Sequence, residues 1–282
     1  MEQSVVNGAG RLEQVLERWW GYKSFRPMQR EIVESVLAGC DTLALMPTGG
    51  GKSLLYQLPT MAGQGLCIVV TPLIALMKDQ VDRLRSRGIA AVAVHSGMDA
   101  RRIDIALDNC AYGDVKFLYI APERLATDTF RLRLQRMNVA LLAVDEAHCI
   151  SQWGYDFRPS YRRIAEIRRL LPGVPVLALT ASATETVAAD IMDSLSFGEP
   201  RIMRSSFARP NLSYVVRRTE DKFGQLVRML SSVAGSAIVY MRTRDGVEQL
   251  CAQLTAEGVG ASFYHGGLPG EERSIRQEEW TS

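Results

Sequence analysis

The chain has 282 residues, of which 47% are hydrophobic and 23% are charged, and its formal net charge is +2. These are ordinary values for a globular protein, and the length allows one large or two medium domains. The balanced charge excludes a uniformly basic protein, although arginines cluster locally, for example at 83–87 and 162–169. We interpret most of these clusters as solvated helix faces, so composition alone does not establish nucleic-acid binding.

Short apolar runs alternate with longer amphipathic segments along the chain. This alternation predicts an α/β fold, a parallel sheet with helices on both faces. The predicted strands are 42–46, 66–71, 90–95, 116–120, 141–145, 174–180, 237–241 and 261–264. The predicted helices are 11–20, 27–38, 53–62, 73–87, 100–109, 161–171, 185–195, 245–257 and 270–280. The polar stretch 204–221 predicts a connection, so we expect a first domain at 1–207 and a second at 208–282.

No apolar run approaches the roughly eighteen residues of a membrane span, and residues 1–10 lack a signal-peptide pattern. The five cysteines are widely spaced without a C-x-x-C pair, and the chain has three histidines. This pattern predicts neither a disulfide framework nor a zinc site. We therefore expect a soluble protein of a reducing compartment, with no membrane partner.

A glycine-rich segment follows the first predicted strand and consists of Met46, Pro47, Thr48, Gly49, Gly50, Gly51, Lys52 and Ser53. At a strand-to-helix turn, backbone N–H groups and the helix N-terminus attract phosphate, and Lys52 adds a full charge. Because Met46 stands where the strict G-x-x-x-x-G-K-[ST] pattern has glycine, the match begins only at Gly51. Alone, the Gly-Lys-Ser sequence would also fit an ordinary helix N-terminus.

Two adjacent carboxylates, Asp145 and Glu146, follow another apolar run at 139–144. Such a pair offers a magnesium ligand and a group that activates water, although it could instead cap a helix. Ligands of parallel α/β sheets bind beyond the carboxyl ends of the strands, where both segments are expected. Together the two segments predict a P-loop NTPase that hydrolyses a nucleoside triphosphate.

Several segments resemble the RecQ family of superfamily 2 DNA helicases across nearly the whole chain: 21–29, 46–53, 71–80, 145–159, 179–184, 207–212 and 264–268. The aromatic-rich stretch 149–159 is the most specific of them. The resemblance implies a RecA-like first domain followed by a partial second RecA-like domain. It also implies further helicase motifs, a zinc module and a winged helix in the parent protein, so we expect the chain to be an N-terminal portion of a helicase core.

The resemblance implies that the cofactors are ATP and Mg²⁺. Tyr22, Arg26 and Gln29 would bind the adenine, and the segment from Thr48 to Ser53 would bind the phosphates. Lys52, Asp145 and Glu146 would be catalytic, with Ser53 and Asp145 as magnesium ligands. The simpler alternative is that Gln29 lies on an exposed helix face and Tyr22 packs in the core.

The resemblance further implies that Trp153, Phe157 and Arg158 bind nucleic acid, together with Tyr155. Exposed aromatic rings can stack on bases without regard to sequence. The alternative is a loop whose aromatic side chains are buried in the core. The residues expected to relay the nucleotide state are His148, Gln152, Thr180 and Ser182. We interpret His95 and His265 as loop or domain-interface residues.

The function implied by the resemblance is an ATP-dependent 3′-to-5′ DNA helicase in the cytoplasm, acting on single-stranded and duplex DNA in repair or recombination. One alternative is an RNA-directed ATPase, because Asp-Glu-Ala-His also marks such proteins. Another is a binding module without efficient turnover. An arginine finger contributes about 10³–10⁵-fold to catalysis, and residues 208–282 contain no matching motif, so we predict weak turnover for this chain alone. The sequence leaves the oligomeric state open.

Overall fold

The computed structural model describes residues 8–154, 156–206 and 211–281. The chain forms two compact units, Met1–Ala208 and Arg209–Ser282, and each is described by itself. The predicted boundary at Phe207 and the motif at 207–212 fall mostly outside the described residues, so the predicted domain limits stay a prediction. Among the described residues, no helix has the length and apolar character required to cross a membrane.

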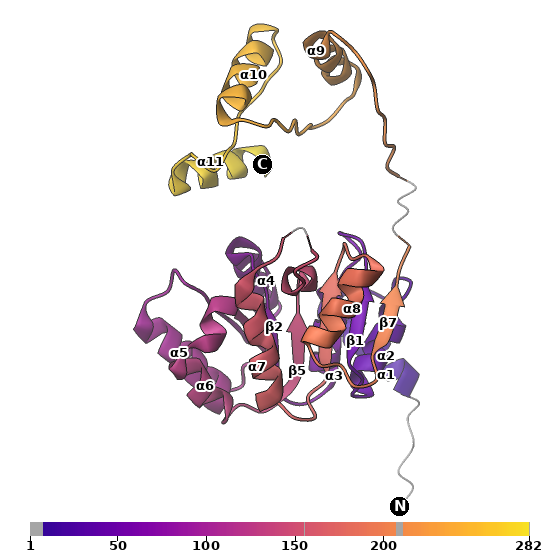
Figure 1. Cartoon of the computed structure of the whole chain (residues 1–282), viewed down its shortest axis with the longest axis vertical. Helices are drawn as coiled ribbons and strands as arrows, with labels where there is room; N and C mark the ends of the chain where they lie inside the picture. The colour runs from indigo at the N-terminus through magenta and orange to yellow at the C-terminus, as the bar shows by residue number, and fades with distance from the viewer. Residues whose placement is uncertain (1–7, 155, 207–210, 282) are drawn as a thin grey trace, which may run out of the picture. The chain divides into compact units, whose positions relative to one another are not determined.

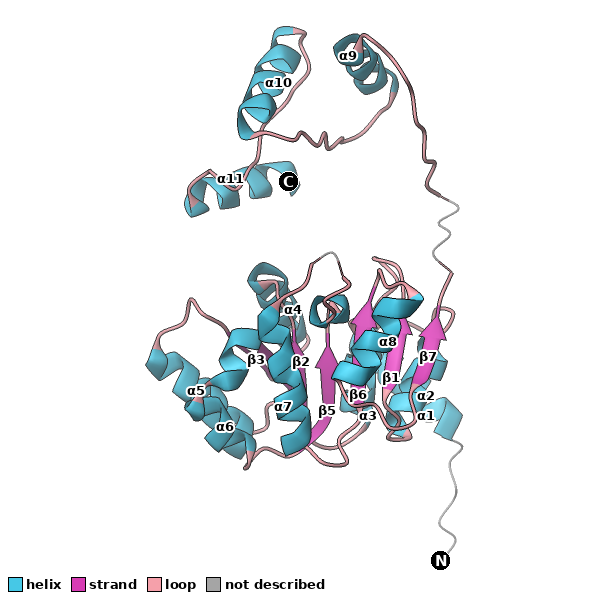
Figure 2. Ribbon diagram, viewed as in Figure 1, coloured by secondary structure: helices cyan, strands magenta, loops and turns pink. Residues whose placement is uncertain are grey.

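The first unit is built on a seven-stranded sheet with the order β3-β4-β2-β5-β6-β1-β7 (Figure 2). All of its pairings are parallel. The strands are β1 Thr42–Leu45, β2 Leu66–Val70, β3 Ala91–Val94, β4 Phe117–Ile120, β5 Val139–Val144, β6 Val176–Thr180 and β7 Arg201–Arg204. The predicted α/β class is confirmed, and six of these strands coincide with predicted ones.

Helices cover both faces of this sheet (Figure 1). On one face lie α5 (Ala100–Tyr112), α6 (Asp128–Leu134), α7 (Arg163–Leu170) and α8 (Glu185–Ser194). On the other lie α1 (Gly8–Trp20), α2 (Gln29–Leu37), α3 (Leu54–Ala62) and α4 (Ile74–Ser86). Side chains alternate along each strand, so Ile68 and Val70 pack on the first face whereas Cys67 and Val69 pack on the second. This double burial explains the continuous apolar runs.

The sheet order brings three loops to one edge. Strand β6 lies between β1 and β5, and all three strands are parallel. The loops that follow them therefore leave the sheet at the same edge. The Met46 N–H donates to the Thr180 carbonyl at 3.1 Å, which continues the pairing of β1 and β6 past the strand ends. The glycine-rich segment, the Asp145 segment and the Thr180 segment thus begin as neighbours.

At the opposite ends of the same strands, a buried ion pair connects the two layers. The Asp41 carboxylate accepts from the Arg168 guanidinium at 3.0 and 3.1 Å and from the Val176 N–H at 2.9 Å. Arg168 belongs to α7, whereas Asp41 precedes β1 and Val176 begins β6. The pair therefore connects the starts of two strands to the last turn of α7. It is a structural contact remote from the loops at the carboxyl edge.

The second unit contains α9 (Lys222–Ser232), α10 (Arg244–Ala256) and α11 (Gly270–Thr281). None of its described residues lies in a strand, so the predicted strands at 237–241 and 261–264 are wrong. Side chains in the first of them, such as Ile238 and Tyr240, are exposed. A strand requires a hydrogen-bonding neighbour, and the described residues of this unit supply none. The apolar composition of these segments predicted strands. A segment becomes a strand only when a neighbouring segment accepts and donates its backbone hydrogen bonds.

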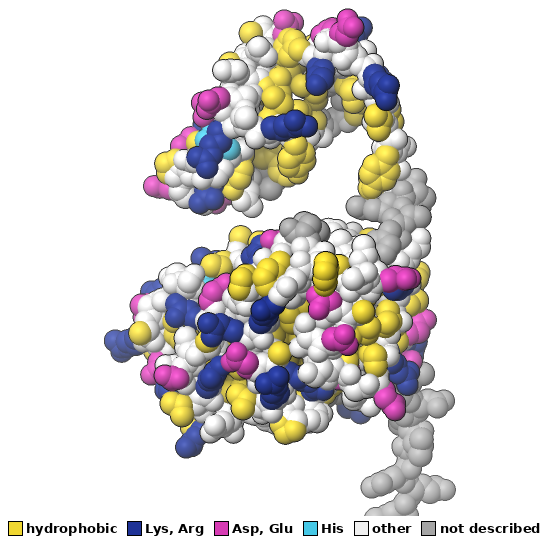
Figure 3. All heavy atoms as spheres, in the orientation of Figure 1, with side chains coloured by type: hydrophobic (Ala, Val, Ile, Leu, Met, Phe, Trp, Pro, Cys, Tyr) yellow, Lys and Arg dark blue, Asp and Glu magenta, His cyan; other side chains and the backbone are white. Residues whose placement is uncertain are grey.

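Among the α-helices and strands of the described residues, three were not predicted: β7, α6 and α9. β7 has two arginines in four residues and lies at the edge of the sheet, so it lacks an apolar run. Helix α6 is only seven residues long. The arginine cluster at 162–169 is mixed in character, since Arg162, Arg163 and Arg169 are exposed whereas Arg168 is the partner of Asp41. Figure 3 shows basic side chains dispersed among acidic and neutral ones over the α5 and α7 face.

Candidate nucleotide site and aromatic loop

The glycine-rich segment forms the turn between β1 and α3, as predicted. Gly49 and Gly51 have φ values of 80° and 79°, a left-handed conformation that glycine adopts without steric cost. Thr48 and Gly49 are exposed, and the segment from Gly50 to Ser53 is half-buried. The loop is therefore open to solvent at its tip and ends where α3 begins. A phosphate group could approach the exposed backbone without displacing core side chains.

Gln29 and Arg26 hold this turn from the side. The Gln29 amide donates to the carbonyls of Gly50 and Gly51 at 3.3 and 3.4 Å, and its oxygen accepts from the Arg26 N–H at 3.0 Å. The Arg26 guanidinium donates to the Gly49 carbonyl at 2.7 Å. Gln29 is buried, so the alternative of an exposed helix face is wrong. Its side chain connects the segment before α2 to the glycine-rich turn.

A cavity of about 300 Å³ opens beside these residues. Its lining includes Tyr22, Arg26, Gln29, Gly51 and Ser53, together with Gln80, Arg83 and Arg87 of and after α4. Tyr22 is 54% exposed, so it does not pack in the core as the alternative supposed. The predicted adenine-binding residues and the phosphate loop therefore border one cavity. Arg83 and Arg87, interpreted from sequence as a solvated face, belong to its wall.

Asp145 and Glu146 follow β5 at the same edge. The Asp145 carboxylate accepts from the Glu146 N–H at 3.0 Å, and the Tyr161 hydroxyl donates to the Asp145 carbonyl at 2.9 Å. Glu146 has a φ of 47°, a conformation that costs a non-glycine residue about 1–3 kcal/mol. The positive φ turns the chain directly after the strand. The pair therefore begins a turn and does not cap a regular α-helix.

Burial raises the pKa of Asp145 to about 6, and the neighbouring Glu146 charge adds to the effect. The positive charge of Lys52 acts in the opposite direction and favours the carboxylate. Lys52 of the glycine-rich segment therefore lies close enough to Asp145 to affect the pKa of its carboxyl. A positive ion at this carboxylate would stabilise its charged form further.

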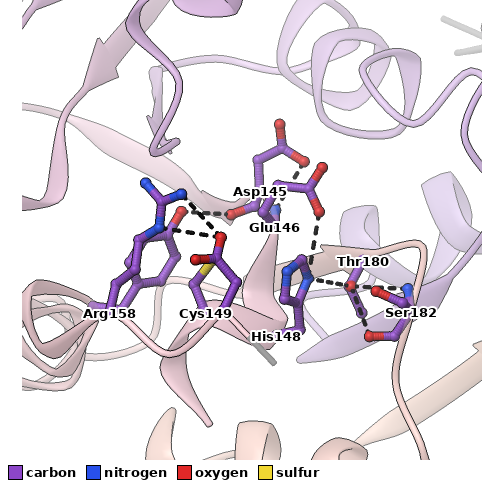
Figure 4. Close-up of polar contacts among 9 residues, drawn as sticks. Asp145, Glu146, His148, Cys149, Arg158, Thr180 and Ser182 are labelled. Atoms are coloured by element: carbon purple, nitrogen blue, oxygen red, sulfur yellow. Dashed lines mark hydrogen bonds and ion pairs between the residues drawn. The ribbon is translucent and has the colours of Figure 1, made fainter. Parts of the chain in front are cut away.

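His148 connects the acidic segment to the segment after β6 (Figure 4). Its Nδ1 lies 2.8 Å from the Thr180 hydroxyl and 3.4 Å from a Glu146 carboxylate oxygen. The Thr180 hydroxyl also accepts from the Ser182 N–H at 3.2 Å. Burial lowers the pKa of His148. Three of the predicted relay residues therefore form one hydrogen-bonded chain, whereas the fourth, Gln152, is exposed.

The aromatic loop, residues 151–158, follows immediately. Trp153 is 75% exposed, so the alternative of a buried ring is wrong for this residue. Phe157 is half-buried under the Arg162 guanidinium, which lies 5.3 Å from the ring centroid. Arg158 donates to the Asp156 carboxylate at 2.9 Å. Tyr155 lies outside the described residues.

The base of this loop is tied to helix α8. The buried Ser151 hydroxyl donates to the Asp190 carboxylate at 2.6 Å and accepts from the Trp153 N–H at 3.2 Å. A second cavity, of about 430 Å³, lies between Trp153, Gly154, Val187 and the segment 181–184. Trp153 thus borders the segment that contains Ser182, one of the predicted relay residues. Asp190 was missed because only the fold brings it near Ser151.

Comparisons of the sequence with known proteins find helicases. Residues 26–191 match the family model described as DEAD/DEAH box helicase. The chain is 39% identical over 260 residues to "ATP-dependent DNA helicase RecQ" of Pasteurella multocida, covering 92% of this chain and 41% of that protein. It is 38% identical over 275 residues to "Probable ATP-dependent DNA helicase RecS" of Bacillus subtilis, covering 96% of this chain and 55% of that protein. The chain thus spans about half the length of these relatives.

Solved structures show the same fold. One is the Mycobacterium smegmatis helicase Lhr bound to ssDNA and AMP-PNP, with a TM-score of 0.66 and 18% identity, covering 96% of this chain and 40% of that one. Another is the DUF1998 helicase MrfA bound to DNA, with a TM-score of 0.70 and 18% identity, covering 98% of this chain and 43% of that one. These likenesses confirm the predicted RecA-like α/β fold.

Proposed function

The chain belongs to the DEAD/DEAH box helicase family, and we propose that it binds ATP beside the glycine-rich turn and couples this nucleotide to single-stranded DNA through the aromatic loop. The observation that carries the proposal is the His148–Thr180 contact of 2.8 Å. It joins the acidic segment after β5 to the segment after β6, and the aromatic loop follows directly on one side of it. Hydrolysis or release of the nucleotide could therefore alter the position of Trp153 through these few contacts.

The residues present suit ATP and Mg²⁺. A Cβ added at Gly51 would lie 2.5 Å from the Gln29 Nε2, and one at Gly50 would lie 3.0 Å from the Pro47 carbonyl oxygen, so side chains are excluded along the turn. Ser53 and Asp145 offer a hydroxyl and a carboxylate, the hard oxygen ligands that Mg²⁺ prefers. Gln29 and Arg26 orient the turn, while Tyr22 offers an exposed ring for the adenine.

Each of these residues has a proposed role in ATP hydrolysis. Lys52 would stabilise negative charge on the β- and γ-phosphates, and Glu146 would orient the attacking water and accept its proton. When bound, Mg²⁺ neutralises charge on the phosphate oxygens. Loss of the γ-phosphate would alter the contacts of Glu146 and His148, and the hydrogen bond from His148 would transmit this difference to Thr180. Trp153 would stack on a base, and Arg158 would meet a phosphate after leaving Asp156.

For the parent protein we propose a RecQ-type 3′-to-5′ DNA helicase that translocates on single-stranded DNA and unwinds duplexes in repair or recombination. The resemblance of the aromatic segment and the names of the relatives support this choice. Residues 1–207 would be the first RecA-like domain and 208–282 the beginning of the second. The chain alone would bind nucleotide but turn it over weakly, because no arginine finger is recognisable in 208–282.

A competition experiment tests the proposed nucleic-acid class. A fluorescent single-stranded DNA is bound to the chain in the presence of magnesium and a non-hydrolysable ATP analogue, then displaced with unlabelled DNA or RNA of the same sequence. We expect DNA to displace the probe more effectively. Stronger displacement by RNA, with dependence on the 2′-hydroxyl, would contradict DNA as the substrate and favour an RNA-directed ATPase.

A further inference from the structure

Three potential metal ligands converge at the junction between the acidic segment and the aromatic loop. One ring nitrogen of His148, the Cys149 thiol and an Asp156 carboxylate oxygen all lie within 4.8 Å of one another. His148 and Cys149 are buried, whereas Asp156 is half-exposed. The sequence analysis predicted no zinc site because it considered cysteine and histidine spacing, whereas the third ligand here is a carboxylate seven residues after Cys149. The N–H of Gly154 donates to the Ser151 carbonyl at 3.2 Å. The turn that this hydrogen bond closes returns the chain toward His148 and Cys149, so that Asp156 lies beside them.

We propose that His148, Cys149 and Asp156 form a binding site for a borderline-soft divalent cation, represented by Zn²⁺, that is distinct from the proposed magnesium site. The types of ligand indicate which ion would bind, since imidazole and thiolate suit Zn²⁺, whereas Mg²⁺ prefers oxygen ligands alone. Three protein ligands with water in the fourth position is a familiar zinc arrangement.

The distances are close to those that zinc requires. With Zn–S near 2.3 Å and Zn–N or Zn–O near 2.0 Å, tetrahedral ligand atoms are separated by roughly 3.5 Å. The Cys149 Sγ already lies 3.6 Å from the Asp156 Oδ2. The remaining separations, bounded at 4.8 Å, need a contraction of up to about 1.5 Å. The half-exposed side of Asp156 provides the entry path.

Metal binding would change the contacts of the aromatic loop. The Asp156 oxygen that faces Cys149 also accepts from Arg158 at 2.9 Å. A divalent cation at this oxygen would compete with the guanidinium and repel it. The thiol proton of Cys149 leaves to solvent as the metal–sulfur bond forms, so charge and protons balance. The bound ion would hold the loop to His148 and release Arg158.

The test is a titration of the whole chain with Zn²⁺ and with Co²⁺ as a spectroscopic probe, without nucleotide or DNA. We expect saturable binding, release of a proton, and the thiolate-to-cobalt charge-transfer absorption. Cys149→Ser should abolish the absorption, and Asp156→Asn, at a half-exposed position, should weaken binding at least tenfold with the fold retained by circular dichroism. The matched control is Cys110→Ser, which removes another buried cysteine in α5 and should leave the titration unchanged.

A second variant pair tests the competition itself. Arg158→Gln removes the cation that shares Asp156 and should tighten Zn²⁺ binding severalfold, whereas Arg162→Gln, which removes the guanidinium beside Phe157, should not. The absence of thiolate absorption in the unaltered chain would overturn the proposal. The proposal would also be overturned if Cys149→Ser and Asp156→Asn bound the metal as tightly as the unaltered chain. It would likewise be overturned if Cys110→Ser lost as much metal binding as Cys149→Ser. Because no nucleotide is present, these outcomes are independent of the proposed ATPase function.

Discussion

The Nδ1 of His148 lies 2.8 Å from the Thr180 hydroxyl, and this contact joins the loop after β5 to the last residue of β6, from which the next loop leaves the sheet. One loop carries the acidic pair and continues into the aromatic loop, and the other leads through Ser182 into α8. The two loops are neighbours because β6 lies between β1 and β5. The contact is therefore placed to transmit the state of the nucleotide site to the proposed DNA-binding side chains.

Thr180→Val should weaken this transmission. Loss of one hydrogen bond at a buried histidine costs about 1–3 kcal/mol, so we expect the effect of an ATP analogue on single-stranded DNA affinity to fall about tenfold. Fluorescence anisotropy with and without the analogue measures that effect. Thr60→Val is the matched control, since its buried hydroxyl donates to the Tyr56 carbonyl within α3. An unchanged nucleotide effect in Thr180→Val would exclude this contact as the relay.

The Asp145 carboxyl should make stability and magnesium binding respond oppositely to pH. Its pKa of about 6 in the folded chain exceeds the 3.8 of an unperturbed aspartate, so the folded state holds the proton more tightly. The contribution of the Asp145 carboxyl to the free energy of unfolding is fully present below pH 3.8 and is lost as pH rises through about 6. Without magnesium, Asp145→Asn should therefore raise the unfolding free energy at pH 7, by up to about 3 kcal/mol. Magnesium-dependent nucleotide affinity should fall as pH drops below 6.

Urea unfolding at pH 7 measures the first effect. Asp156→Asn provides a control of opposite sign, because the Arg158 hydrogen bond lowers the pKa of Asp156 and its ionised form is favoured. That variant should lose stability at pH 7. If Asp145→Asn also destabilised the magnesium-free protein, the Asp145 carboxyl would not be the costly buried group described here.

The turn at Gly51 should not accept a side chain. Gly51→Ala places a methyl group 2.5 Å from the Gln29 Nε2 at a φ of 79°, so the Gln29 amide must leave its hydrogen bonds to the turn and nucleotide binding should be weakened. Gly88→Ala is the matched control, since Gly88 has a φ of 75° and open space around it. It should cost about 1 kcal/mol of stability and leave nucleotide affinity unchanged. Retained affinity in Gly51→Ala would refute the proposed phosphate-binding turn.

The exposed ring of Trp153 should contribute to DNA binding and little to stability. Trp153→Ala is expected to cost about 1–3 kcal/mol in single-stranded DNA affinity, because it removes a stacking surface. Its melting temperature should be unchanged, since the ring is 75% exposed. Trp280→Ala removes another exposed tryptophan, in α11, and serves as the control. Equal DNA affinities for the two variants would contradict the assignment of Trp153.

The Asp41–Arg168 pair should support the fold without taking part in binding. Asp41→Ala removes the carboxylate partner of the half-buried Arg168 guanidinium and leaves the Val176 N–H without its acceptor, and is expected to cost about 3 kcal/mol of unfolding free energy. Arg169→Ala, at an exposed neighbouring position, should stay within about 0.5 kcal/mol of the unaltered chain. Denaturant unfolding distinguishes them. A small effect of Asp41→Ala would show that the pair is dispensable.

Much of the first unit could be predicted from sequence because its strands are buried on both faces and therefore apolar throughout. The glycine-rich turn and the acidic pair each follow such a run, so their meeting at one edge follows from parallel topology. The edge strand β7 could not be predicted, because its arginines interrupt the apolar pattern. The Ser151–Asp190 and Asp41–Arg168 contacts join residues 39 and 127 positions apart, and no local pattern encodes them. The second unit shows the converse, since strand-forming composition alone did not produce strands.

Magnesium-ATP binding and hydrolysis by this chain, with and without single-stranded DNA, tests the central claim most directly. The variants are Lys52→Ala and Glu146→Gln. We predict that the unaltered chain and Glu146→Gln bind the nucleotide, that Lys52→Ala does not, and that turnover is weak even with DNA. Equal nucleotide binding by Lys52→Ala, or no binding by the unaltered chain, would contradict the proposed site. Strong DNA-stimulated hydrolysis lost in both variants would instead contradict the predicted weakness of the isolated chain.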